Sequence, residues 1–334
     1  MGFFDTIGRG WKLSKLSFSV VKADPELLLY TFLSAMMVFV TIAAAAYPGY
    51  EAEQSDESHW AMTDQVIDPE TDEPKMVMNE ETGKLEPVGR EPTGEYMAWI
   101  FLTYMVGTII VVFWNSAIIA SAHERLTGGD PTIMTGIKAA FSRIHIIILW
   151  GIIAGTVGLL LRIARDAISN KKAPAALKIL AGIMLWMVEI AWWMYTFFII
   201  PMIVLEKKGI GDGLRGGRAL FGKTWGENVT SGLGIGFISL VGIVFSLAVA
   251  GLIFFTISPI VGIIVAVALI GIIVLWTNTA EVVVVAALYE YAKTGKMPDL
   301  NGNGAKFEEA LPWESKSGWA NESAETKAWR EGTG

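Results

Sequence analysis

The distribution of apolar residues along the chain predicts six membrane-spanning helices. A helix needs about 20 apolar residues to cross a bilayer core of about 30 Å. Six segments meet that requirement, and they are residues 27–47, 97–122, 144–161, 179–205, 233–255 and 260–288. Only residues 256–259 separate the last two segments, and Pro259 would interrupt a continuing helix. We therefore expect these two spans to form a tight hairpin.

The same pattern occurs three times. Residues 6–12 resemble residues 132–138, which lie 126 residues later, and Glu124-Arg125 recurs 82 residues later as Glu206-Lys207. The offsets differ by 44 residues, close to the length of a polar insert between residues 48 and 95. Without that insert the chain reads as three similar units, each a short amphipathic helix followed by two apolar helices. We place the units at residues 1–128, 130–206 and 212–295 of a six-helix membrane domain, 1–295.

The fold class predicted from these patterns is an all-α integral membrane protein made of three hairpin repeats. All three units run in the same direction, so a pseudo-symmetry axis would lie along the membrane normal. The second span of each unit ends near a glutamate, which is Glu124, Glu206 or Glu290.

The amphipathic helices are expected to lie in the lipid headgroup layer. In the first unit the apolar stripe that would face the membrane comprises Phe3, Ile7, Trp11, Phe18 and Val21. In the other two units we expect an aspartate to cap the N-terminus of the helix, because its carboxylate can accept from free backbone N–H groups. These caps are Asp130 and Asp212.

The insert at 48–95 is strongly acidic. It holds 14 acidic and 3 basic residues, whereas the whole chain has a net charge of -7. Residues 69–77 are echoed by residues 79–88, and this pattern with its Asn-x-x-Thr-Gly turn predicts a small β-rich insert outside the cytoplasm. Asp68, Glu70 and Asp72 resemble the first ligands of an EF-hand, but Glu73 occupies the glycine position and Asn79 the last ligand position. We therefore interpret the insert as a solvated acidic face rather than a calcium loop.

The basic residues predict the orientation. With the N-terminus inside, the inner segments hold 18 of the 26 Lys and Arg residues, as the positive-inside rule requires. Both termini would then lie in the cytoplasm, including an acidic, mostly disordered tail at 296–334. A cluster from Arg162 to Lys178 falls outside and is the exception. The predicted location is the cytoplasmic (inner) membrane.

Composition excludes several kinds of site. The chain has no cysteine, which rules out disulfides and thiolate chemistry, and its three histidines have no metal-ligand spacing. It has no concentrated basic face for nucleic acid. No Gly-x-Ser-x-Gly or His-Glu-x-x-His motif occurs. We expect no enzyme activity, no cofactor and no metal.

Four polar residues inside spans form the candidate intramembrane site. Glu281 lies nine residues before Glu290, about 13 Å along the helix, and Asn115 lies nine residues before Glu124 at the matching depth of the repeat. Asn278 shares a helix face with Glu281. Buried ionisable residues are functional candidates, so these residues could mark a cation or proton pathway. The interpretation we favour is that they are hydrogen-bonded links between helices.

Glu189 is the fourth residue. It is expected near the outer boundary, beside an aromatic belt at Trp186, Trp192 and Trp193. There it can pair with Arg162 or Arg165.

Parts of the chain resemble a known family. The residues that carry the resemblance are Gly2-Phe3-Phe4-Asp5 with Asp24-Pro25-Glu26, Glu206-Lys207 with Lys223 and Trp225, and Tyr289, Tyr291 and Pro298. They resemble an uncharacterised prokaryotic six-span membrane-protein family. The wider group is similar to the membrane domain found beside glycerophosphodiester phosphodiesterases. The resemblance implies a helical membrane fold, and it transfers no activity and no functional residue.

Two functions fit these patterns. The first is a non-catalytic envelope or membrane-organising protein that forms homo-oligomers through Gly-lined spans and binds anionic lipid at the cytoplasmic face. The acidic insert could bind a protein partner. The alternative is a cation or proton channel or transporter with a path lined by Asn115 and Glu281, in which the insert concentrates cations at the outer mouth.

Overall fold

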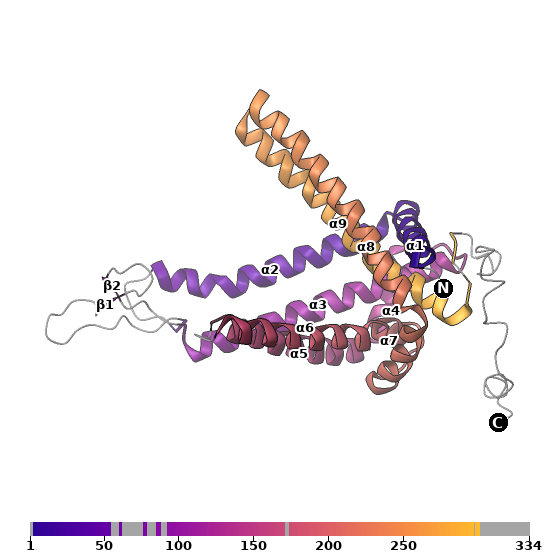
Figure 1. The fold of residues 1–334 in the computed structure, drawn as a ribbon, viewed down its shortest axis with the longest axis horizontal. Coiled ribbons are helices and arrows are strands. Elements are labelled where there is room, and N and C mark those ends of the chain that lie inside the picture. Colours follow the sequence, from indigo (N-terminus) through magenta and orange to yellow (C-terminus); the bar gives the residue numbers. More distant parts are fainter. Residues whose placement is uncertain are drawn as a thin grey trace.

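The computed structural model describes residues 3–54, 60–61, 76–78, 85–87, 92–170, 174–296 and 298–300. Nearly all of the predicted tail, most of the acidic segment 68–79 and the predicted turn at 79–83 lie outside these residues. The described residues form helices and two short strands (Figure 1). They are α1 (Phe3–Ala23), α2 (Glu26–Gln54), β1 (Met76–Met78), β2 (Leu85–Pro87), α3 (Gly94–Leu126), α4 (Ile133–Ser142), α5 (Ile144–Asn170), α6 (Ala175–Thr196), α7 (Ile199–Val204), α8 (Ile210–Thr256) and α9 (Pro259–Thr294).

The six predicted spans are confirmed as long apolar helices. Six segments of the described chain are long and apolar enough to cross a membrane. They are Glu26–Ala52, Gly94–Leu126, Ile144–Ser169, Ala176–Val204, Gly226–Thr256 and Pro259–Thr294. Helices satisfy their backbone hydrogen bonds internally, which is the condition for crossing hydrocarbon.

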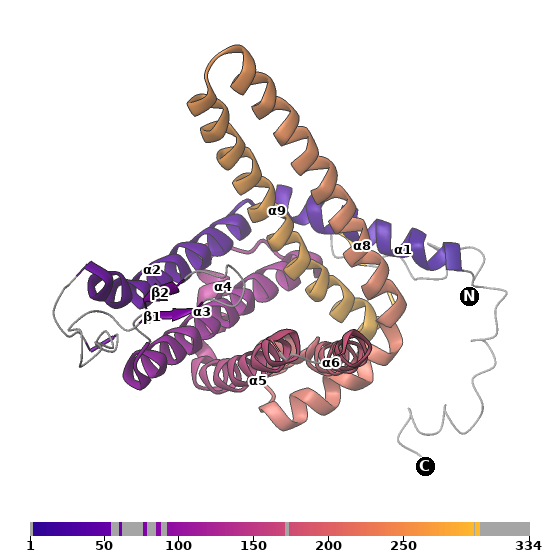
Figure 2. The same ribbon diagram turned by 60° about the vertical axis from the view of Figure 1, so that its left-hand side comes forward.

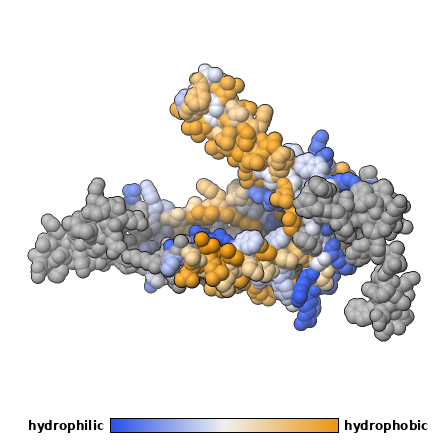
Figure 3. All heavy atoms as spheres, in the orientation of Figure 1, coloured by the Kyte–Doolittle hydropathy of each residue, from blue (hydrophilic) through white to orange (hydrophobic). Residues whose placement is uncertain are grey.

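The spans form two groups. Helices α2, α3, α5 and α6 run side by side, whereas α8 and α9 form a hairpin that diverges from them (Figures 1 and 2). The hairpin turns at Ile257 and Ser258, and α9 starts at Pro259 as predicted. We call the end of the molecule where α1, α4 and α7 lie the junction end; β1 and β2 lie at the opposite end. Figure 3 shows the diverging hairpin as an almost entirely apolar surface.

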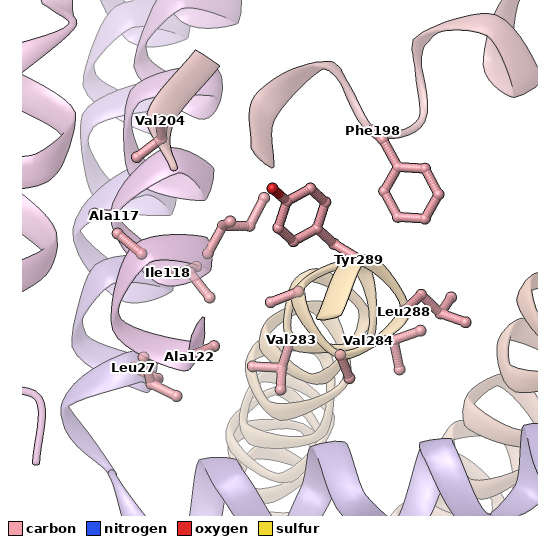
Figure 4. Packing of buried hydrophobic residues seen from close by; sticks show 14 of the residues in the cluster. Leu27, Ala117, Ile118, Ala122, Phe198, Val204, Val283, Val284, Leu288 and Tyr289 are labelled. Atoms are coloured by element: carbon pink, nitrogen blue, oxygen red, sulfur yellow. The ribbon is translucent and has the colours of Figure 1, made fainter. Parts of the chain in front are cut away.

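The core lies where the second spans meet, near the junction end. Leu288 and Tyr289 of α9 are fully buried there, together with Ile118 of α3 and Phe198 before α7 (Figure 4). Side chains of α1 and α2 complete the same cluster. The half of the hairpin farther from this core keeps its apolar side chains exposed, with Phe255 85% exposed near the turn.

Helix α1 packs on protein along part of its predicted membrane face. It lies against α8 and α9, where Leu13 and Val21 are fully buried. Within the predicted stripe Trp11 and Phe18 are half-buried. The approach to α8 is close, since a Cβ added to Gly10 would lie 2.2 Å from Thr230 Oγ1.

Helix α4 is held tightly against α3. The buried hydroxyl of Tyr30 on α2 donates to the carbonyl oxygen of Ile133 at 2.7 Å and lies 3.2 Å from Ser121 Oγ of α3. A Cβ on Gly136 would lie 2.6 Å from the carbonyl oxygen of Ala117, so glycine permits this crossing. The amphipathic helix of the second unit is therefore fixed by both spans of the first.

The two predicted aspartate caps are wrong. Thr132 caps α4 in a capping box with Thr135, and Asp130 is instead bound to Arg125. Gly209 stands at the N-cap of α8, which places Asp212 in the first turn. An aspartate in the first turn still favours the helix through the dipole.

Two predicted helix boundaries also differ. The amphipathic helix of the third unit is continuous with the fifth span in the 47-residue α8, because no proline or other break occurs between residues 210 and 256. The fourth span is interrupted at Phe197 and Phe198 between α6 and α7. Pro201 explains the interruption, because it has no N–H to donate to the carbonyl of residue 197.

Within the insert, β1 and β2 pair antiparallel, with Val77 opposite Glu86. Helix α2 continues past Pro48 to Gln54, so the helical part is longer than the sequence pattern indicated. At this end Tyr96 donates to the carbonyl of Ala45 at 3.0 Å and joins α3 to α2. The rest of the predicted β-rich insert lies outside the described residues.

Candidate polar sites in the spans and at the junction end

Glu281 and Asn278 lie on one exposed side of α9. Their neighbours Thr277, Thr279 and Ala280 are buried. The Thr279 hydroxyl lies 2.6 Å from that of Thr31 and joins α9 to α2. The buried side of α9 therefore packs against the rest of the protein. Neither Glu281 nor Asn278 forms a hydrogen bond or ion pair with another described residue, so this polar pair has no partner within the described chain.

Asn115 does not join this pair. It is half-buried on α3, between the buried residues Trp114 and Ser116. No hydrogen bond connects Asn115 to Glu281 among the described residues. The sequence repeat predicts the same depth in the membrane for Asn115 and Glu281. Depth alone does not decide which way a side chain points around its helix.

Glu189 is bound in an ion pair. Its carboxylate accepts from Arg165 of α5, one of the two partners expected from the sequence. Close by, Lys178 Nζ donates to the carbonyl oxygen of Ser169 at 3.0 Å. A shallow recess of about 280 Å³ lies among these residues and Trp186. The Lys178–Ser169 bond lies at the end of the α5–α6 hairpin away from the junction, and the Glu189–Arg165 pair joins the two helices farther along.

A second ion cluster, at the junction end, was not predicted. Arg125, at the end of α3, donates through Nε to Asp24 Oδ2 at 2.6 Å and also pairs with Asp130 at 2.6 Å. Asp24 is only 4% exposed and separates α1 from α2. A recess of about 490 Å³ beside this cluster is also lined by Glu26. Asp24 and Arg125 were both visible in sequence motifs, but nothing in the sequence paired positions 101 residues apart.

Glu206 is the centre of a denser network. Tyr289 of α9 donates to Glu206 Oε1 at 2.5 Å, and Lys208 Nζ lies 2.7 Å from Oε2. Lys293 Nζ lies 3.2 Å from Oε1. Burial raises the pKa of the Glu206 carboxyl, but the hydrogen bonds from Lys208, Tyr289 and Lys293 outweigh it and lower the pKa to about 2. This carboxylate is therefore ionised and fully compensated at neutral pH.

A related contact joins α3 to α9. His123 Nδ1 lies 3.5 Å from Glu290 Oε2. Tyr289 directly precedes Glu290 and contacts Glu206 of the second predicted unit. His123 directly precedes Glu124 and contacts Glu290 of the third predicted unit. The ends of α3, α7 and α9 are thus connected in series. A circular arrangement of three units would produce such contacts, and the repeat itself stays a prediction.

The described residues contain no group of three or more His, Asp or Glu side chains placed to hold a metal ion. The polar residues that do meet are matched as donor and acceptor or as opposite charges. Their arrangement can connect helix ends and hold them in place.

The fold defines a polytopic membrane protein whose candidate spans are all helices. The sequence profile of a family of unknown function, DUF6159, matches residues 94–299, which is more than half of the chain. The chain belongs to this family. The matched region begins with α3 and extends just beyond α9, so α1 and α2 lie outside it. No curated protein matches the sequence.

Proposed function

We propose that the protein is a non-catalytic component of the cytoplasmic membrane that organises the membrane or envelope and acts as a homo-oligomer. The observation that carries this proposal is the exposed pair Asn278 and Glu281 on a spanning helix. A charged side chain near the bilayer centre costs about 2.5–3.5 kcal/mol on insertion scales. A second copy of the chain that supplies hydrogen-bonding groups at this depth removes much of that cost.

The junction end supports a structural role. Its carboxylates at Asp24, Glu206 and Glu290 face Arg125, Lys293 and His123 rather than an open chemical site. Exposed lysines on α1, at positions 12, 15 and 22, would bind anionic headgroups if this end lies in the cytoplasm, as the basic residues predict.

The test is the mass of the protein in a native-like bilayer. We expect two or more copies per particle when the full chain is extracted into lipid nanodiscs and measured by light scattering or stepwise photobleaching. A monodisperse monomer, both in nanodiscs and in mild detergent, would contradict the proposal. The control asks whether copies are merely crowded into one particle. For a true oligomer, the number of copies per particle should be the same in detergents of different micelle size.

A cation or proton pathway is the second candidate, because an exposed carboxyl in a span can also line water. In liposomes this function predicts a flux that falls when Glu281 is replaced by Gln. It further predicts that deleting residues 50–94 lowers cation conductance or selectivity. Equal flux in wild type and Glu281→Gln would exclude the pathway.

A further inference from the structure

A continuous exposed stripe runs along one side of α9. Ile264, Val267, Gly271, Val274, Asn278 and Glu281 follow one another at alternating spacings of three and four residues, and all six are exposed. Ile264 is 62% exposed and Val267 69% exposed. Alternating spacings of three and four keep residues on one side of a helix.

The stripe lies on the side of α9 turned away from α8. The two helices approach closely at Gly262, whose added Cβ would meet the backbone of Phe254, and at Ile273, which lies near Gly242. At 100° per residue, residues 262 and 273 lie about 100° or more around the helix from Ile264, Val267, Gly271 and Val274. Nothing lies within 4 Å of a Cβ added to Gly271 on the stripe. The hairpin to which α9 belongs diverges from α2 and α3 (Figure 2).

The chemistry of the stripe identifies what can cover it. Val and Ile side chains can pack on lipid tails, but Asn278 offers both a donor and an acceptor and Glu281 offers acceptors. Lipid tails supply neither. A partner helix must therefore bring hydrogen-bonding groups to the depth of residues 278–281. Opposite residues 264–274 it must present small or β-branched residues.

A second copy of α9 meets both conditions. Copies in one membrane share the same orientation, so a two-fold axis along the membrane normal brings identical residues to equal depth. The stripe has the spacing of the a and d positions of a parallel coiled coil, where a single Asn fixes register. The Asn278 amides of two copies can then hydrogen-bond to each other and to the Glu281 carboxyl of the facing copy.

We infer that α9 pairs in parallel with α9 of a second copy along the stripe from Ile264 to Glu281, with Asn278 as the polar layer that sets the register. This inference rests on the proposed self-association and specifies its surface. The Gly-lined spans of the sequence analysis contain two glycine pairs, Gly151/Gly155 and Gly232/Gly236. Cβ atoms added to Gly151 and Gly155 would meet Ile109 and Met105 of the same chain, whereas nothing lies within 4 Å of Cβ atoms added to Gly232 and Gly236.

The absence of cysteine from the chain makes the test direct. A single cysteine introduced as Val274→Cys would lie in the pairing surface, and one introduced as Ile272→Cys, also exposed, would lie about 160° away around α9. On mild oxidation in native membranes we expect a disulfide-linked dimer at position 274 with several-fold higher yield than at position 272. Disulfides form only when the two Cα atoms come within about 7 Å.

The outcomes separate the surface from the proposed function. Equal yields at 274 and 272, or no product at 274, would overturn the pairing of α9. If the nanodisc mass still shows an oligomer in that case, self-association stands and uses another surface. A monomer in nanodiscs would overturn both. A cross-linked product with the mass of a heterodimer would show that a different protein covers the stripe, and it would also overturn the inference.

Discussion

Tyr289 donates a 2.5 Å hydrogen bond to Glu206, and this bond connects the ends of two spans that lie 83 residues apart in the sequence. Tyr289 is fully buried, and its ring packs beside Phe198 at a centroid distance of 6.2 Å. The hydroxyl therefore supplies the polar end of an otherwise apolar contact. Lys208 and Lys293 complete the shell of Glu206, so removing any one donor leaves the carboxylate charged and less well compensated.

Replacing Tyr289 by Phe should destabilise the protein by about 1.5–3 kcal/mol, the range for a hydrogen bond to a charged group. The ring and its packing are retained, so the loss isolates the hydroxyl. The measurement is the thermal unfolding temperature of detergent-purified protein. Tyr195→Phe is the matched control, because Tyr195 is exposed and should change little. Equal effects of the two substitutions would contradict the role given to the Glu206 bond.

The Glu206 network also predicts a response to acid. The pKa of this carboxyl is lowered from 4.5 to about 2, so the folded state holds it ionised more readily than the unfolded chain does. Its contribution is complete above pH 4.5 and is lost as the pH falls toward 2. Because Glu206 is partly exposed, we expect a loss on the order of 2 kcal/mol.

Thermal unfolding measured between pH 7 and pH 2 checks this expectation. The Glu206→Gln variant should be less stable at pH 7 and should lose less stability between pH 4.5 and 2 than the wild type. Parallel pH profiles for the two proteins would show that Glu206 is not the titrating group.

Removing Arg125 should be costly, because Asp24 would remain as a buried and unpaired charge. For Arg125→Gln we expect a destabilisation of about 3–5 kcal/mol, as for other broken buried pairs. Expression level and unfolding temperature measure it. Arg218→Gln removes the same charge from an exposed position of α8 and should be nearly neutral. If Asp24→Asn together with Arg125→Gln is no more stable than Arg125→Gln alone, the buried pair is not the cause.

Gly136 should not tolerate a methyl group. In Gly136→Ala the new Cβ would lie 2.6 Å from the carbonyl oxygen of Ala117, and a backbone atom in a helix cannot move aside. We expect a loss of about 1–3 kcal/mol, as for overpacked cores. Gly182→Ala in α6 meets nothing within 4 Å and should be neutral or slightly stabilising. The unfolding temperatures of the two variants give the comparison, and a loss of equal size in both would refute close packing of α4 on α3.

The polar layer of α9 gives a prediction about assembly rather than stability. Asn278→Leu keeps the apolar character of a span but removes the amide that sets the register. In the Val274→Cys background it should lower the yield of the cross-linked dimer, whereas Asn115→Leu on α3 should leave it unchanged. Quantified non-reducing gels of oxidised membranes provide the readout. An undiminished yield in Asn278→Leu would remove Asn278 from the interface.

The sequence by itself determined the six spans and the turn at Pro259. Apolar segments of this length must form helices in a bilayer, because the hydrocarbon offers no partner for backbone N–H and C=O groups. It also indicated the pairing of Glu189, which lies in the middle of the fourth span, with an arginine of the third. These features depend on neighbouring residues along one helix or one hairpin, so periodicity and spacing are sufficient to find them.

The tertiary structure alone decided which polar residues far apart in the sequence meet. The contacts of Asp24 with Arg125 and of Glu206 with Tyr289 depend on how helices far apart in sequence cross, and composition does not fix those crossings. The same is true of Asn115 and Glu281, for which the repeat predicts a shared depth but between which the described structure has no hydrogen bond. It is also true of α1, whose burial on α8 depends on Gly10 and Ser14 meeting Thr230 and Ser231. A sequence pattern gives the position of a residue around and along its own helix, and only packing decides what stands opposite.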